Sequence, residues 1–186
     1  MFIQTEATPN PQTLKFLPGR EVLAGEPRDF RDSGSANVSP LASALFTIDG
    51  ITGVFLGSDF IAVTRDATDW AHLKPAVLGA IMEHYLTGNP ILTDGGSSKA
   101  PEGEIFFEPQ DAELVEVIKE LLETRIRPAV AMDGGDITLK GYRDGMVYLH
   151  MQGACSGCPS STATLKNGIE NLLRHFVPGV EGVREV

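Results

Sequence analysis

The sequence predicts a mixed α/β (α+β) chain of two small domains, each with helices packed on a short sheet that contains a hairpin. Three observations predict this class. A Gly/Pro/Ser-rich stretch without hydrophobic periodicity interrupts the 186 residues. On each side of it, apolar residues recur at helical spacing in two segments, and strand-like segments lie between them. We therefore assign residues 1–87 and 105–186 to the two domains and residues 88–104 to a flexible linker.

The first domain is predicted to begin with an extended segment and to continue as helix, strand, strand, helix. Residues 8–16, which hold two prolines, are predicted to complete the sheet as an edge strand, with a partner-recognition strand as the alternative. A short helix is predicted near residues 41–46 and a longer one over residues 73–85, where apolar positions recur at helical spacing. Residues 53–58 and 59–65 are predicted to be paired strands.

The second domain repeats this order around a hairpin. Apolar residues over 114–122 lie on one helical face, and this helix is predicted to end at Arg127, because Pro128 disfavours helix at the residue before it. Strands are predicted over residues 137–142 and 146–151, on either side of an Asp-Gly dipeptide suited to a tight turn. A second amphipathic helix over residues 165–176 and a final short strand over residues 180–186 complete the domain.

Charge and hydropathy exclude two classes of partner. The formal net charge of -10, with no compensating run of Lys or Arg, would repel phosphate backbones and anionic lipids, so we expect no nucleic acid partner. No apolar stretch approaches the ~20 residues of a spanning helix, so we expect no membrane association. The N-terminus lacks the pattern of a secretory signal or presequence, which predicts a cytoplasmic, bacterial-type location, or the mitochondrial matrix if the chain is a processed form.

The two cysteines, Cys155 and Cys158, are the strongest chemical signal. Two cysteines three residues apart make a poor disulfide framework but suit metal or redox chemistry in a reducing compartment. The spacing lets both sulfurs face one point, as in iron–sulfur, zinc and dithiol sites. Because Pro159 suits the first turn of a following helix, the thiolates should lie near a helix N-terminus, and we expect the pKa of the cysteines to fall.

Ligand counting favours a shared site. Common [2Fe–2S] and [4Fe–4S] clusters take four cysteine ligands, and this chain offers two. Two chains related by a twofold axis could each contribute Cys155 and Cys158 to one cluster. Such a cluster would be exposed and easily released, which suits a carrier that delivers clusters and not an enzyme.

Two other interpretations of the cysteines stay open on spacing alone. Zinc would need two further ligands, for which His150 and His175 are the candidates. A dithiol oxidoreductase would cycle Cys155 and Cys158 between thiol and disulfide.

Other conspicuous residues are given structural roles. Asp133 and Asp136 flank two glycines and could bind a hard metal ion, but a structural turn is the favoured interpretation. Trp70, His72 and His84 are assigned to packing or to the surface.

The segments Asp133-Gly-Gly-Asp-Ile and Gly153-Ala-Cys-Ser-Gly-Cys-Pro-Ser-Ser-Thr-Ala-Thr-Leu-Lys-Asn-Gly-Ile-Glu closely resemble the C-terminal domain of NifU, of the Nfu-type iron–sulfur scaffold family. Thr8-Pro-Asn-Pro-Gln-Thr-Leu-Lys-Phe, together with Asp49-Gly-Ile-Thr-Gly-Val-Phe and Asp59-Phe-Ile-Ala-Val-Thr, resembles the N-terminal domain joined to it in Nfu proteins. The resemblance covers nearly the whole chain apart from the linker.

The resemblance implies an iron–sulfur cluster scaffold and carrier, not an enzyme. In this family a dimer bridges a [4Fe–4S] cluster through the motif cysteines, which are Cys155 and Cys158 here; [2Fe–2S] is the alternative. The implied partners are a second copy when the cluster is bound, apo iron–sulfur client proteins and upstream cluster-assembly proteins. The N-terminal domain would recognise partners or modulate delivery.

Overall fold

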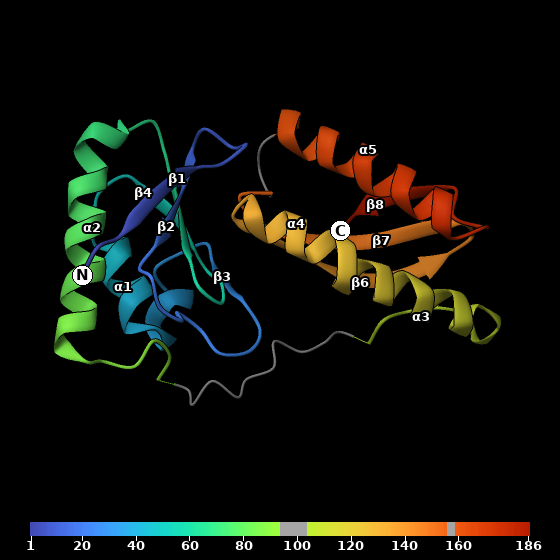
Figure 1. The fold of residues 1–186 in the computed structure, drawn as a ribbon, viewed down its shortest axis with the longest axis horizontal. Coiled ribbons are helices and arrows are strands. Elements are labelled where there is room, and N and C mark those ends of the chain that lie inside the picture. Colours follow the sequence, from blue (N-terminus) through green and yellow to red (C-terminus); the bar gives the residue numbers. More distant parts are fainter. Residues whose placement is uncertain (94–103, 156–158) are drawn as a thin grey trace. The chain divides into compact units, whose positions relative to one another are not determined.

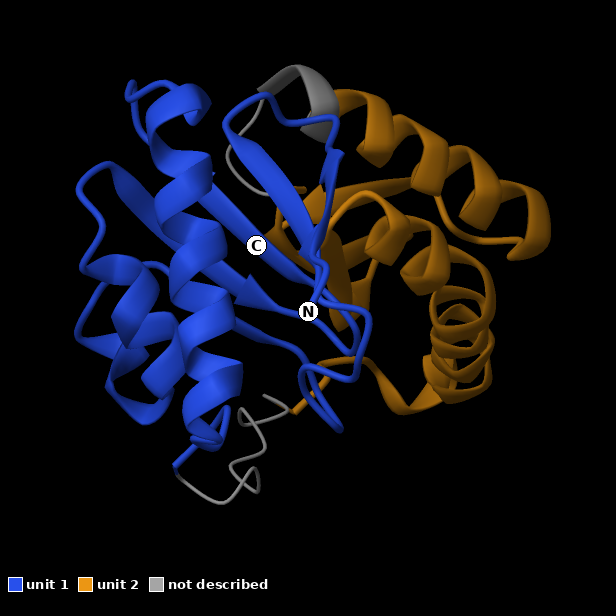
Figure 2. Ribbon diagram, turned by 60° about the vertical axis from the view of Figure 1, so that its left-hand side comes forward, with its two compact units in different colours: residues 1–99 blue, residues 100–186 orange. Residues whose placement is uncertain are grey.

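The computed structural model describes residues 1–93, 104–155 and 159–186, with the backbone alone for residues 159–162. The chain divides into two compact units, Met1–Lys99 and Ala100–Val186 (Figure 2). Each unit combines helices with a small sheet that contains an antiparallel hairpin, so the predicted fold class is confirmed. No described helix is long and apolar enough to cross a lipid bilayer.

Unit 1 is a five-stranded antiparallel sheet in the order β1-β2-β5-β4-β3, with two helices (Figure 1). Its main elements are β1 (Gln4–Ala7), β2 (Thr13–Leu17), β3 (Arg28–Phe30), α1 (Pro40–Phe46), β4 (Ile51–Leu56), β5 (Ile61–Arg65) and α2 (Trp70–Thr87). The predicted hairpin corresponds to β4 and β5. The N-terminal segment does complete the sheet, but β1 forms the edge and β2 lies inside it, and β3 was not predicted.

Helix caps explain where α1 begins and where α2 begins and ends. The Ser39 hydroxyl accepts a hydrogen bond from the Ala42 amide at 3.2 Å, and the Asp69 carboxylate accepts one from the Ala71 amide at 3.1 Å. Gly88 ends α2 with a φ of 70°, a conformation that favours glycine. Between these caps, apolar side chains of both helices pack on the sheet in a single core that includes Leu41, Leu45, Leu73, Val77, Ile81, Phe16, Leu56 and Ile61.

Unit 2 is a three-stranded sheet in the order β6-β7-β8, packed against helices (Figure 1). Its main elements are α3 (Ala112–Leu121), a π-helical turn (Leu122–Ile126), α4 (Arg127–Met132), β6 (Gly135–Arg143), β7 (Met146–Gly153), α5 (Pro159–Phe176) and β8 (Gly182–Glu185). The predicted Asp-Gly turn joins β6 and β7, with φ values of 51° at Asp144 and 78° at Gly145. The final strand, β8, pairs in parallel with β7.

The predicted helix end at Arg127 is wrong. The chain stays helical through Met132: a π-helical turn from Leu122 to Ile126 connects α3 directly to α4. That turn interrupts the regular i to i−4 hydrogen-bond pattern, so Pro128 falls in the first turn of α4, where a missing N–H is tolerated.

Candidate functional site

Cys155 lies in the turn that carries the chain from β7 into α5. β7 ends at Gly153, which has a φ of 66°, and α5 begins at Pro159, as its place in the sequence predicted. The Ala154 amide donates a hydrogen bond to the Gly134 carbonyl at 3.1 Å, which ties this turn to the residues before β6. Cys158, the second predicted ligand, lies outside the described residues.

The Cys155 side chain is 5% exposed and belongs to the core of unit 2. Gly135, the first residue of β6, lies against it. A Cβ atom on Gly135 would lie 2.6 Å from the Cys155 Sγ and 2.7 Å from the Gln152 carbonyl oxygen. The thiol can therefore occupy this position only because residue 135 has no side chain. Sequence analysis missed this role, although the Gly-Gly pair between two aspartates was a usable signal.

The electrostatic environment of Cys155 differs from the prediction. Burial is the main cause that raises the pKa of the Cys155 thiol to about 12, and the carboxylates of Asp133, Asp136 and Glu185 raise it further. The expectation that the cysteine pKa falls is therefore wrong for Cys155. Loss of hydration and three nearby negative charges both disfavour the thiolate.

A buried ion pair supports the strand that carries Gly135. Asp136 is 4% exposed, and its two carboxylate oxygens accept hydrogen bonds from Nε and Nη2 of Arg127, each at 2.9 Å. Arg127 Nη1 also donates to Glu123 at 2.6 Å. The hydrogen bond to Asp136 is the main cause that raises the pKa of Arg127. This bidentate ion pair between Arg127 and Asp136 joins the start of α4 to the start of β6, so Asp136 serves a structural role.

The predicted additional zinc ligands do not gather around Cys155. His150 Nδ1 lies 2.9 Å from the Val186 carbonyl oxygen, at the C-terminus of the chain. His175 lies in the last turn of α5, whose 18 residues separate it from the Cys155 turn by roughly 25 Å at 1.5 Å per residue. Among the described residues, no three His, Cys, Asp or Glu side chains are placed to hold a metal ion together.

The fold and this turn define a two-unit α/β protein that presents a buried thiol where a strand leads into a helix. Residues 3–88 match the family model "Scaffold protein Nfu/NifU N terminal", and residues 118–184 match the NifU-like domain. The chain belongs to the Nfu/NifU family of iron–sulfur cluster scaffold proteins.

Named relatives resemble the chain along its whole length. It is 50% identical to human "NFU1 iron-sulfur cluster scaffold homolog, mitochondrial", covering 100% of this chain and 72% of that protein. It is 51% identical to Arabidopsis thaliana "NifU-like protein 5, mitochondrial", covering 100% of this chain and 68% of that protein. A NifU-like protein from Saccharomyces cerevisiae, solved by NMR, aligns with a TM-score of 0.46 and 25% identity over 50% of this chain and 85% of that chain.

Proposed function

We propose that the protein holds a [4Fe–4S] cluster between two copies, through Cys155 and Cys158 of each, and passes it to apo-proteins. The observation that carries this proposal is that a chain of the scaffold family has fewer cysteines than one cluster needs as ligands. The whole sequence contains two cysteines, and a cluster of this kind takes four cysteine ligands. A second chain supplies the missing pair, and [2Fe–2S] is the alternative cargo.

The raised pKa of Cys155 supports weak retention of the cluster. A thiol must lose its proton before it can bind iron, so a cluster on Cys155 competes with a proton that is held unusually firmly. Weaker retention at equilibrium favours transfer of the cluster to the thiols of a client protein. The same pKa disfavours the dithiol oxidoreductase alternative, since a protonated thiol is a poor nucleophile at neutral pH.

We propose apo iron–sulfur clients and upstream cluster-assembly proteins as partners. The chain is proposed to consist of an N-terminal domain over residues 1–87, a linker over residues 88–104 and a C-terminal domain over residues 105–186. In this scheme the N-terminal domain recognises partners or modulates delivery.

The proposed cellular location depends on the organism: it is the cytoplasm for a bacterial chain and the mitochondrial matrix for a processed mitochondrial one. The names of the human and Arabidopsis relatives support the second location.

Anaerobic reconstitution with iron and sulfide tests this function. We expect about two irons per chain, a visible absorption band that dithionite bleaches, a dimeric mass, and transfer of the cluster to an apo-protein. Cys155→Ala and Cys158→Ala should each abolish loading, while the matched control His175→Ala should load normally. A colourless zinc-bound dimer, a metal-free monomer with disulfide reductase turnover, or loading that survives either cysteine change would contradict the proposal.

A further inference from the structure

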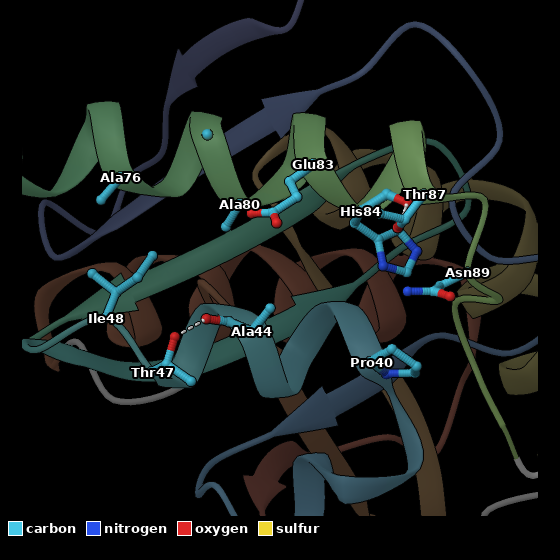
Figure 3. A pocket seen from close by; sticks show the side chains of 11 residues that line it. Pro40, Ala44, Thr47, Ile48, Ala76, Ala80, Glu83, His84, Thr87 and Asn89 are labelled. Atoms are coloured by element: carbon cyan, nitrogen blue, oxygen red, sulfur yellow. Dashed lines mark hydrogen bonds between the residues drawn. The ribbon is translucent and has the colours of Figure 1, made fainter.

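A pocket of about 470 Å³ opens between α1 and α2 of unit 1 (Figure 3). It exists because the facing side chains are small: Ala44 on α1, and Ala76, Gly79 and Ala80 along one stripe of α2. A Cβ atom on Gly79 would meet nothing within 4 Å. The volume lies within the range of pockets that hold small ligands. These four residues form an apolar stripe, while polar groups make up the larger part of the lining as a whole.

His84 supplies a buried polar group at one end of this pocket. Its side chain projects from α2 toward the gap that faces α1 (Figure 3). The residue is 5% exposed, and its Nε2 atom is buried without a hydrogen-bond partner among the described residues. Burial lowers the pKa of His84, so the imidazole is neutral at pH 7 and can present Nε2 as an acceptor when Nδ1 carries the proton. An unpaired buried polar atom is costly unless a ligand pairs with it.

The charge of the pocket selects among ligands. Glu83 is the one formally charged side chain in the lining, and it projects toward the same gap as His84 (Figure 3). Thr87 and Asn89 add further oxygen acceptors, and no Lys or Arg is among the lining residues. Carboxylate, hydroxyl and amide oxygens together with a neutral imidazole suit a hydrogen-bond donor with positive charge and disfavour an anion.

We propose that this pocket binds an alkylammonium group, whose aliphatic chain lies on Ala76, Gly79 and Ala80 and whose ammonium donates to Glu83 and, once the His84 ring turns toward the pocket, to Nε2 of His84. An amphipathic cation matches both parts of the pocket, since its carbon chain covers apolar surface while its charged end meets the acceptors. Lysine side chains and free alkylamines share this chemistry. The site is independent of the cysteine turn, so it does not rest on the proposed cluster function.

NMR of the full chain with labelled histidines tests the site, with His72, His150 and His175 as internal references. The probes are butylammonium, butanol and butyrate at pH 7.5. We expect a saturable shift of the His84 ring signals with butylammonium, a weaker response to butanol, and none to butyrate. An unchanged His84 signal with butylammonium, or an equal response to butyrate, would overturn the proposal.

Matched variants locate the response. Gly79→Leu places a side chain in the pocket without a clash at Cβ and should abolish the butylammonium shift. Gly168→Leu, at a helical glycine of α5 whose Cβ would also meet nothing within 4 Å, should leave it intact. Glu83→Gln should weaken binding about two- to fivefold, as expected for an exposed ion pair. Binding that survives Gly79→Leu, or that is unaffected by Glu83→Gln, would overturn the assignment.

A second ligand separates the two sources of the ammonium group. Nα-acetyl-lysine methylamide carries the lysine side chain with its backbone, whereas butylammonium carries the alkyl chain alone. Equal or tighter binding of the lysine derivative would support a lysine of a partner protein as the ligand. Binding of butylammonium alone would support a free amine.

Discussion

Gly135 and Cys155 are in such close contact that no other residue fits at position 135 without movement of the thiol. A Cβ atom there would lie 2.6 Å from Sγ and 3.2 Å from Cβ of Cys155. The Gln152 carbonyl oxygen would be 2.7 Å away, and this backbone atom cannot yield without a shift of the strand. The first strand of the β6–β7 hairpin therefore sets the position of the thiol.

Gly135→Ala should displace Cys155 and reduce cluster loading, with a loss of about 1–3 kcal/mol in the free energy of unfolding from overpacking. The iron content after reconstitution and urea unfolding of the apo-protein measure the two effects. Gly168→Ala is the control, because its Cβ meets no atom within 4 Å and alanine favours a helix by roughly 0.5–1 kcal/mol over glycine. Wild-type loading by Gly135→Ala would contradict the positioning role.

Arg127→Met should destabilise unit 2 by about 3 kcal/mol, because it leaves the Asp136 carboxylate buried without its bidentate partner. Glu123→Gln, which weakens only the exposed end of the network, should cost under ~1 kcal/mol. Urea denaturation of both variants at pH 7 compares them. Equal losses of unfolding free energy in the two variants would show that the buried ion pair between Arg127 and Asp136 is not the stabilising part.

The sequence predicted the hairpin, the turn and most helices well, because Asp144-Gly145 and the apolar periodicities are local signals. It did not predict the continuation from α3 into α4, since a π-helical turn has no strong local pattern and the proline rule favoured a stop. The start of a helix at Pro159 was predicted, but the direction of the Cys155 pKa shift was not. Burial and the approach of Asp133, Asp136 and Glu185 arise from tertiary packing, which sequence spacing does not show.

The raised pKa of Cys155 predicts slow alkylation at neutral pH in the apo-protein. In a Cys158→Ser variant, where Cys155 is the single thiol, the rate of reaction with iodoacetamide should rise about tenfold per pH unit from pH 7 to 10 without a plateau, because the thiolate fraction keeps increasing. Alkylation followed by mass spectrometry gives the rates. A plateau below pH 9 would show that burial and the nearby carboxylates do not control this thiol.

The lowered pKa of His84 predicts loss of stability in mild acid. The unfolded chain binds a proton at this histidine below about pH 6.5, while the folded chain holds the imidazole neutral until its lower pKa is reached. The free energy of unfolding should therefore fall between pH 6.5 and that lower value. His84→Gln should reduce this dependence in urea titrations at pH 7.5 and 5.5, whereas His72→Gln, at an exposed site on the same helix, should retain it.

The central claim is that four cysteines from two chains hold one cluster, and native mass spectrometry of mixed chains tests it most directly. Wild-type protein and a mass-tagged Cys155→Ser/Cys158→Ser variant are mixed in equal amounts and reconstituted anaerobically with iron and sulfide. We predict that one [4Fe–4S] cluster appears in pairs of wild-type chains and in no other species. A cluster carried by a wild-type monomer, or by a pair of one wild-type and one variant chain, would contradict the account.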